Sequence, residues 1–220
     1  MKTYWSIDGP SKAPREFCYQ FVKYDGSNIR AEWSKKRGWY KFGTRKCMID
    51  EKDPIFGRAV PLFKQKYGDD LAKVFTSEKL FEGVQSVVVF AEFFGSKSFA
   101  GMHFPDDTAW DIVLFDVNLH KKGMLGPKEF IDHFGHLKVA ELVDSGNLNE
   151  EVIEAVRKET IPLESKYEIK TEVPEGVICK GGKGHNLWMC KIKTERYKDE
   201  LRKRYETDWV KIWGVDEDNY

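Results

Sequence analysis

The chain lacks the features that mark secreted, membrane-embedded and disulfide-bonded proteins. No C-x-x-C pair occurs among its four cysteines, and the longest apolar run, residues 84–94, is interrupted by polar residues. The first residues carry no apolar stretch of the signal-peptide kind. We therefore expect a cytoplasmic (cytosolic or nuclear) protein with no membrane partner, whose reduced thiols fill its core: Cys18, Cys47, Cys179 and Cys190.

Net charge is also absent, because 36 basic and 36 acidic side chains cancel. No overall field therefore draws the chain toward nucleic acid. Basic residues are nevertheless concentrated in two segments: residues 35–46 contain six and no acid, and they predominate again in 180–204. Such segments are usually solvated faces, but two of them could flank a groove for a polyanion.

Apolar residues, in contrast, are sufficient for one large folded domain. The 220 residues are 41% hydrophobic and 14% aromatic, which excludes a disordered chain. Strand patterns dominate, and helical patterns occur without regular β-α-β alternation. We therefore predict an α+β fold, with mostly antiparallel sheets flanked by helices.

The expected elements follow from periodicity and from turn and cap residues. The pattern over residues 53–80 predicts two or three short helices, because Pro61 and Gly68 interrupt it. Asp25-Gly26 predicts a tight turn that pairs the strands on either side of it. The other expected helices are 127–137, 149–159 and 195–207, and the expected strands are 17–23, 27–33, 38–44, 84–94, 109–117, 175–180 and 187–193.

Several short segments hold residues that could carry chemistry, although each also has an ordinary structural explanation. Asp25-Gly26 serves a turn, Phe115 suits a buried strand, and Lys191-Ile192-Lys193 suits an exposed strand face. Their order is more informative than any one of them. It runs Lys23-Tyr24-Asp25-Gly26, Phe90-Ala91-Glu92-Phe93-Phe94-Gly95, Leu114-Phe115-Asp116-Val117, Glu175-Gly176-Val177-Ile178-Cys179-Lys180 and Lys191-Ile192-Lys193.

These five segments, in this order, resemble the motifs of the covalent nucleotidyltransferase superfamily, which contains ATP-dependent DNA ligases, RNA ligases and mRNA capping enzymes. The resemblance implies a ligase-type, ATP-grasp-like nucleotidyltransferase domain. Lys23 would be the nucleophile that forms lysyl-AMP with ATP, and Glu175 would bind Mg²⁺ or Mn²⁺. The nucleotide-binding residues implied are Asn28, Arg45, Glu92, Phe115, Lys180, Lys191 and Lys193.

The resemblance also implies separate tasks for these residues. Glu92 would bind the ribose, and the ring of Phe115 would stack on the purine. Arg45 lies where these ligases have an arginine that contacts phosphate. The lysines of the last two motifs, with a metal ion, would lower the pKa of Lys23 and neutralise charge on the phosphates.

Asn28 favours one branch of the superfamily. Nick-sealing RNA ligases of phage type carry K-x-x-G-x-N, whereas many DNA ligases and capping enzymes have arginine at the position of Asn28. Asp25 departs from the histidine often found at its position in that RNA ligase branch. We therefore expect an RNA ligase that joins 5'-phosphate and 3'-hydroxyl ends. The alternatives are a minimal DNA ligase, a capping guanylyltransferase, and a non-catalytic nucleic-acid-binding module.

The segment after Lys193 is shorter than the C-terminal domain, often an OB-fold, that is common in this superfamily. We expect residues 1–194 to form the nucleotidyltransferase domain and residues 195–220 to form a charged helix and tail, without an OB-fold. That helix would either bind a nucleic-acid backbone or cover the domain. A protein partner could also replace the missing domain.

Overall fold

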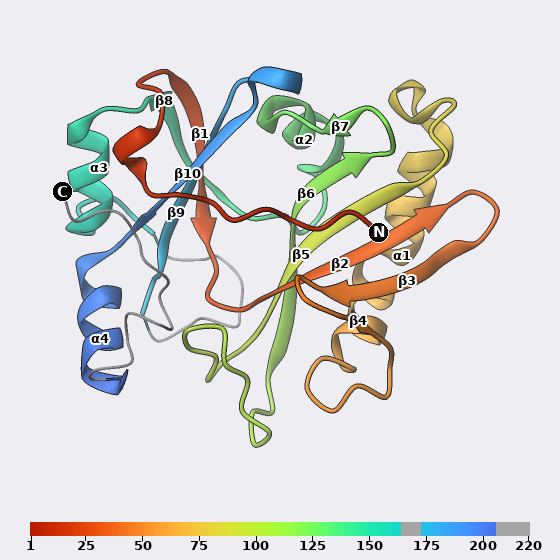
Figure 1. Ribbon diagram of the computed structural model, residues 1–220, viewed down its shortest axis with the longest axis horizontal. Coiled ribbons are helices and arrows are strands. Elements are labelled where there is room, and N and C mark those ends of the chain that lie inside the picture. Colours follow the sequence, from red (N-terminus) through yellow and green to blue (C-terminus); the bar gives the residue numbers. More distant parts are fainter. Residues whose placement is uncertain (164–172, 206–220) are drawn as a thin grey trace.

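The computed structural model describes residues 1–163 and 173–205, and it consists of two antiparallel sheets that lie side by side (Figure 1). The smaller sheet has the order β10-β9-β1-β8, and the larger has the order β4-β3-β2-β5-β6-β7. Every strand pair within the two sheets is antiparallel. The predicted α+β class with antiparallel sheets is therefore confirmed.

The bounds of the elements match most of the expected ranges. The smaller sheet contains β1 (Phe17–Lys23), β8 (Leu142–Asn147), β9 (Gly176–Gly181) and β10 (Trp188–Lys193). The larger contains β2 (Ser27–Ser34), β3 (Gly38–Thr44), β4 (Met48–Ile49), β5 (Val87–Gly95), β6 (Trp110–Leu119) and β7 (Gly123–Met124). The α-helices are α1 (Ala59–Ser77), α2 (Pro127–Phe134), α3 (Glu150–Arg157) and α4 (Glu195–Tyr205), and the 3-10 turns are η1 (Pro10–Lys12), η2 (Lys79–Phe81) and η3 (Gly184–Asn186).

The prediction of a hairpin at Asp25-Gly26 was wrong. β1 pairs with β8 and β9, whereas β2 pairs with β3 and β5, so the chain crosses from one sheet to the other at this turn. Gly26 is needed for close packing, because a Cβ atom there would lie 2.4 Å from the carbonyl oxygen of Phe93. The local turn signal was real, but pairing between distant strands decided which sheet each strand joined.

The prediction of several short helices over residues 53–80 was also wrong, because α1 is one continuous helix of 19 residues. Pro61 lies in its first turn, where a backbone N–H has no partner within the helix, so proline costs little there. Gly68 lies against Trp39, whose indole Nε1 donates to the Gly68 carbonyl at 2.8 Å. Gly68 therefore lies within the helix beside Trp39 and does not end it.

The larger sheet is apolar on the face that α1 covers and mixed on the other face. Residues such as Ile29, Phe63 and Phe93 belong to the main core between α1 and the sheet. The N-terminal segment, residues 1–8, crosses the opposite face in front of both sheets (Figure 1). There Arg30 donates to the carbonyl of Met1, and Tyr4 packs against Phe90.

The smaller sheet has its own core on the side of α3. Cys18, Cys179 and Cys190 are buried in it as expected. Cys47 is an exception to the prediction of core cysteines, because it lies exposed in the turn before β4. Its backbone N–H donates to the hydroxyl of Thr44, so this residue closes a turn.

The end of the expected C-terminal helix falls at Tyr205, and the remainder of the predicted segment 195–220 lies outside the described residues. Within the described ranges, no helix combines the length and the apolar character needed to span a lipid bilayer.

Substitution of Gly26 by alanine should destabilise the fold. Because the new Cβ would meet backbone atoms that cannot rotate away, we expect the free energy of unfolding to fall by about 1–3 kcal/mol. Urea denaturation measures this change. Gly146→Ala in β8 is the matched control, since no atom lies within 4 Å of its added Cβ. Equal stability of the two variants would contradict the close-packing role of Gly26.

Candidate active site

A cavity of about 660 Å³ lies between the two sheets, and it collects the residues singled out in the sequence. Its walls come from β1, β2, β5, β6, β9 and β10, together with the N-terminal segment and α4. Every site residue expected from the sequence lines it: Lys23, Asn28, Arg45, Glu92, Phe115, Glu175, Lys180, Lys191 and Lys193. Segments separated by up to 170 residues thus form one site, although the role of each residue stays a prediction.

Strand register brings Lys23 beside Glu175. Lys23 and Lys193 are both opposite Gly176 in the ladders of β9, so the ends of three strands meet next to Glu175. The Nζ atom of Lys23 lies 2.5 Å from Oε2 of Glu175, and that of Lys193 lies 3.4 Å from Oε1. A single buried carboxylate therefore holds two lysines.

Alternation along β10 explains the K-x-K pattern. Cys190 and Ile192 point into the core beneath α3, so the alternate residues Lys191 and Lys193 face the cavity. The interpretation of this strand as an ordinary exposed face is thereby excluded for Lys193, which is 7% exposed.

The pKa of Lys23 is shifted in the opposite direction from the expected lowering. Burial lowers its pKa, but the carboxylates of Glu175 and Glu92 outweigh this effect, so the pKa of Lys23 is raised above its usual value. The same pairing, first with Lys23 and then with Lys193, offsets the cost of burial and leaves the pKa of Glu175 lowered. Lys23 is therefore an ammonium ion here, and it must lose its proton before it can act as a nucleophile.

Asn28 and Glu92 lie opposite each other on β2 and β5. Both atoms of the Asn28 amide are buried and have no hydrogen-bonding partner among the described residues. Such a group costs free energy unless a ligand or water pairs with it. The unpaired amide thus leaves one donor group and one acceptor in the cavity wall open to a polar ligand or to water.

The carboxyl of Glu92 has an unusual proton affinity. Burial, reinforced by the charges of Glu175 and Asp25, raises its pKa to about 8 against the opposing effect of Lys23. At neutral pH the group therefore carries a proton for much of the time. It can then donate as well as accept a hydrogen bond.

Phe115 lines the cavity from β6, which excludes a purely internal role in the core. The ring of Tyr4 meets it edge-on, with centroids 5.1 Å apart. The Tyr4 hydroxyl donates to Asp116, and Lys180 lies 2.9 Å from the same carboxylate. Lys180 also donates to the carbonyl of Phe115 at 2.8 Å, so it fixes the strand that presents this ring.

Four residues that form contacts at or beside the site were not among the expected site residues: Tyr4, Asp25, Asp116 and Tyr197. Asp25 accepts hydrogen bonds from the N–H groups of Ala100 and Gly101 at 2.7 and 2.8 Å, and from the Tyr197 hydroxyl at 2.9 Å. Burial and the charge of Glu175 raise its pKa to about 6. The sequence carried no signal for these contacts, because the partners are far apart in the chain.

The balance of charge around the cavity favours an anion. Six lysine or arginine side chains line it, against three carboxylates, and the lining Lys180 is also paired with Asp116 outside the lining. One of those carboxylates, Glu92, is largely protonated near neutral pH because burial raises its pKa to about 8. A polyphosphate would balance the excess positive charge of this partly buried cavity.

Comparison with known proteins identifies the fold. No protein-family model and no curated protein sequence matches the chain. Among solved structures it is similar to an RNA ligase of Naegleria gruberi: a mutant without ligand matches with a TM-score of 0.63 at 14% identity, over 92% of this chain and 58% of that one. A mutant of the same ligase with AMP and Mn matches with a TM-score of 0.60 at 14% identity, over 91% of this chain and 58% of that one. A mutant with ATP and Mn matches with a TM-score of 0.60 at 15% identity, over 89% of this chain and 57% of that one.

The likeness confirms the expected fold, which is that of RNA ligases, at low sequence identity. The chain spans somewhat more than half the length of the ligase structures that it matches.

Glu92 predicts a pH-dependent stability. The pKa of Glu92 is raised from 4.5 in the unfolded chain to about 8 in the folded protein. The free energy of unfolding is therefore highest below about pH 4.5, where the carboxyl is protonated in both states, and it falls as pH rises toward about 8. Glu92→Gln should therefore gain stability relative to the unaltered protein between these two pH values, as measured by urea denaturation. Glu82→Gln, at an exposed position, is the control. Parallel stability profiles for Glu92→Gln and the unaltered protein would contradict the prediction.

Proposed function

We propose that this protein is an ATP-dependent RNA ligase that acts through a covalent lysyl-AMP intermediate on Lys23. The observation that carries the proposal is the convergence of all nine expected site residues around one cavity, with Lys23 between the two sheets. The RNA ligase structures of similar fold support it, because they hold ATP or AMP together with Mn.

In the first step, neutral Lys23 attacks the α-phosphorus of ATP. The N–P bond forms as the bond to the bridging oxygen breaks, pyrophosphate leaves with the electron pair of that bond, and the proton released from the lysine nitrogen passes to pyrophosphate or to water. Lys191, Lys193 and Arg45 are placed around the cavity where they can neutralise charge that develops on the phosphates. AMP then passes to a 5'-phosphate end, and a 3'-hydroxyl displaces it.

The nucleoside would lie on the opposite wall. Phe115 offers an aromatic face, and Glu92, largely protonated at neutral pH, can exchange hydrogen bonds with ribose hydroxyls. The unpaired amide of Asn28 can pair with the same part of the nucleotide or with its phosphates.

The residues fit a divalent cation shared with the substrate. No group of three or more potential ligands that could hold a metal occurs within the described ranges, so the described residues do not form a complete metal site by themselves. Glu175 supplies one hard carboxylate, which suits Mg²⁺ or Mn²⁺ bound jointly with phosphate oxygens and water. Such an ion supplies charge neutralisation at the phosphates. Glu175 would then hold Lys23 less firmly as an ammonium ion, because its charge is shared.

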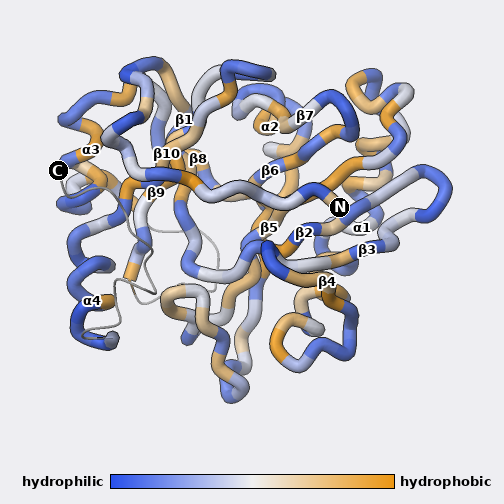
Figure 2. The backbone as a smooth tube through the Cα atoms, viewed as in Figure 1, coloured by the Kyte–Doolittle hydropathy of each residue, from blue (hydrophilic) through white to orange (hydrophobic). Residues whose placement is uncertain are grey.

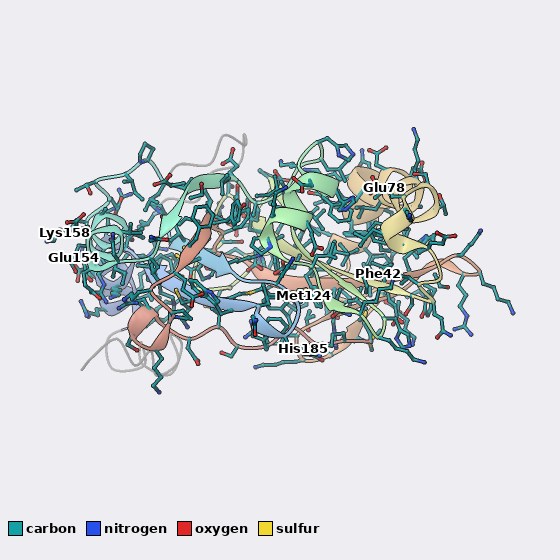
Figure 3. All side chains as sticks on the ribbon, turned by 90° about the horizontal axis from the view of Figure 1, so that it is seen from above. Phe42, Glu78, Met124, Glu154, Lys158 and His185 are labelled. Carbon is teal, nitrogen blue, oxygen red and sulfur yellow. The ribbon has the colours of Figure 1, made fainter. Side chains whose placement is uncertain are left out.

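Loss of the nucleophile should abolish the covalent adduct. Protein treated with pyrophosphate to remove any attached AMP should gain the mass of one AMP after incubation with ATP and Mg²⁺. Lys23→Ala should gain none, as measured by intact mass. Lys158→Ala is the control, since Lys158 also pairs with a glutamate, Glu154, at 2.9 Å, but at an exposed position directly after α3 (Figure 3).

The same experiment separates the alternatives. A GMP adduct from GTP would favour a capping guanylyltransferase, and failure of the unaltered protein to form either adduct would favour a binding module. An undiminished adduct on Lys23→Ala would contradict the assigned nucleophile. Sealing of nicked RNA against nicked DNA then distinguishes an RNA ligase from a DNA ligase.

Asn28→Ala should separate ligand binding from stability. Removal of a buried amide without a partner should leave the free energy of unfolding unchanged or raise it. If the amide pairs with the nucleotide, the KM for ATP in self-adenylation should rise by about tenfold, which corresponds to about 1.4 kcal/mol. Loss of stability with an unchanged KM would show that Asn28 serves the fold and not the nucleotide.

A further inference from the structure

The two basic segments of the sequence differ in the structure. Every basic side chain on α4 lies near a carboxylate, whereas among the described residues of segment 35–46 only Lys41 does, at 3.8 Å from Glu32. On α4, each basic side chain lies near a carboxylate: Arg196 at 2.8 Å from Glu159, Lys198 at 3.2 Å from Glu195, Arg202 at 2.8 Å from Asp199, and Lys203 and Arg204 at 3.8 and 2.8 Å from Glu200. The opposite side of this helix is anchored, since Tyr197 and Leu201 pack against Phe99. α4 therefore covers the domain with its charges largely compensated.

The basic hairpin, defined here as β2, β3 and the turn at residues 35–37, is different. Lys35, Lys36 and Arg37 are exposed in its turn, and no ion pair forms at any of the three within the described part of the chain. Glu32 is the single acidic residue between Ser27 and Ile49, against seven basic ones. In Figure 2 the tip of this hairpin is hydrophilic, and in Figure 3 nitrogen-tipped side chains extend from it beyond the body.

The basic hairpin leads away from the cavity on the cavity side of the larger sheet. Asn28, Arg30 and Glu32 alternate along β2, so they share the face that Asn28 presents to the cavity. Residues 1–3 of the N-terminal segment lie on this face beside Arg30 and Glu32, so the cations there that remain open to a ligand are those of β3 and of the turn. Lys41 is opposite Glu32 in the ladder and shares that face. At the other end of β3, Arg45 and Lys46 line the cavity itself.

The spacing suits an extended polyanion. The seven residues of β3 span about 23 Å at about 3.3 Å per residue. Cations lie at the cavity end, at Lys41 and at the turn, where Arg37 also rests 5.1 Å from the ring of Tyr40. Nucleic acid carries its phosphates at regular short intervals, and basic side chains that lack partners bind them by releasing counterions.

We propose that the basic hairpin binds the sugar-phosphate backbone of the RNA substrate outside the cavity, with the strand running along β3 from Arg45 to the turn at residues 35–37. This inference rests on the proposed ligase function. On this proposal the basic hairpin contacts the RNA backbone, and α4 does not.

The test compares two triple variants that remove the same charge. Lys35→Ala/Lys36→Ala/Arg37→Ala removes three cations that have no acidic partners, and Arg196→Ala/Arg202→Ala/Lys203→Ala removes three that lie near carboxylates. Binding of a fluorescent nicked RNA duplex is measured by anisotropy at several salt concentrations. The hairpin variant should bind about tenfold or more weakly, and the slope of log affinity against log salt should fall by about 2 to 3. The α4 variant should bind as the unaltered protein does.

Self-adenylation with ATP is measured on the same samples, and it should be equal in all three proteins because the substituted residues lie outside the cavity. Absence of the adduct in the unaltered protein would refute the ligase proposal, while the binding data would still test the hairpin. Unchanged RNA affinity and salt dependence in the hairpin variant, an equal loss in the α4 variant, or no RNA binding by the unaltered protein would each overturn the inference.

Discussion

The crossing of the chain between the two sheets at Asp25 and Gly26 is the constraint on which the cavity depends. Because β1 and β2 belong to different sheets, Lys23 and Asn28 enter one space from opposite walls. Gly26 lets the crossing pass against the backbone of Phe93, and Asp25 ties it to a distant loop and to α4. A hairpin at this turn would have placed both strands in one sheet and left no second wall.

Electrostatics then connects the stability of the site to its proposed chemistry. The ion pair between the partly buried Lys23 and the buried Glu175 compensates both charges, and a lone carboxylate at the depth of Glu175 would be strongly destabilising. The same contact raises the pKa of Lys23 and so keeps the proposed nucleophile protonated. Substrate phosphates and a shared cation would have to replace this pairing, which makes the reactive state of Lys23 conditional on a bound nucleotide.

Local pattern predicted most strands and helices, and the order of motifs predicted the residues around the cavity. Sheet membership could not be predicted in this way, because turn residues such as Asp25-Gly26 describe backbone geometry and not the partners of the strands on either side. β8 was missed because its sequence, Leu142–Asn147, is polar and mostly exposed at the edge of a sheet. Tyr4 was missed because nothing in a single N-terminal aromatic residue indicates that it will cross to Asp116.

In the two basic segments, the spacing between acidic and basic residues predicts ion pairing better than the number of basic residues does. Along α4 the acids lie three or four residues before the bases, as in Asp199 to Arg202 and Glu200 to Arg204, and helical geometry turns that spacing into ion pairs. The basic hairpin has one acid for five bases, and strand geometry cannot bring Glu32 to the exposed turn. Similar runs of basic residues thus give a compensated helix in one place and an uncompensated hairpin turn, residues 35–37, in the other. Only the second keeps its full electrostatic attraction for a phosphate backbone.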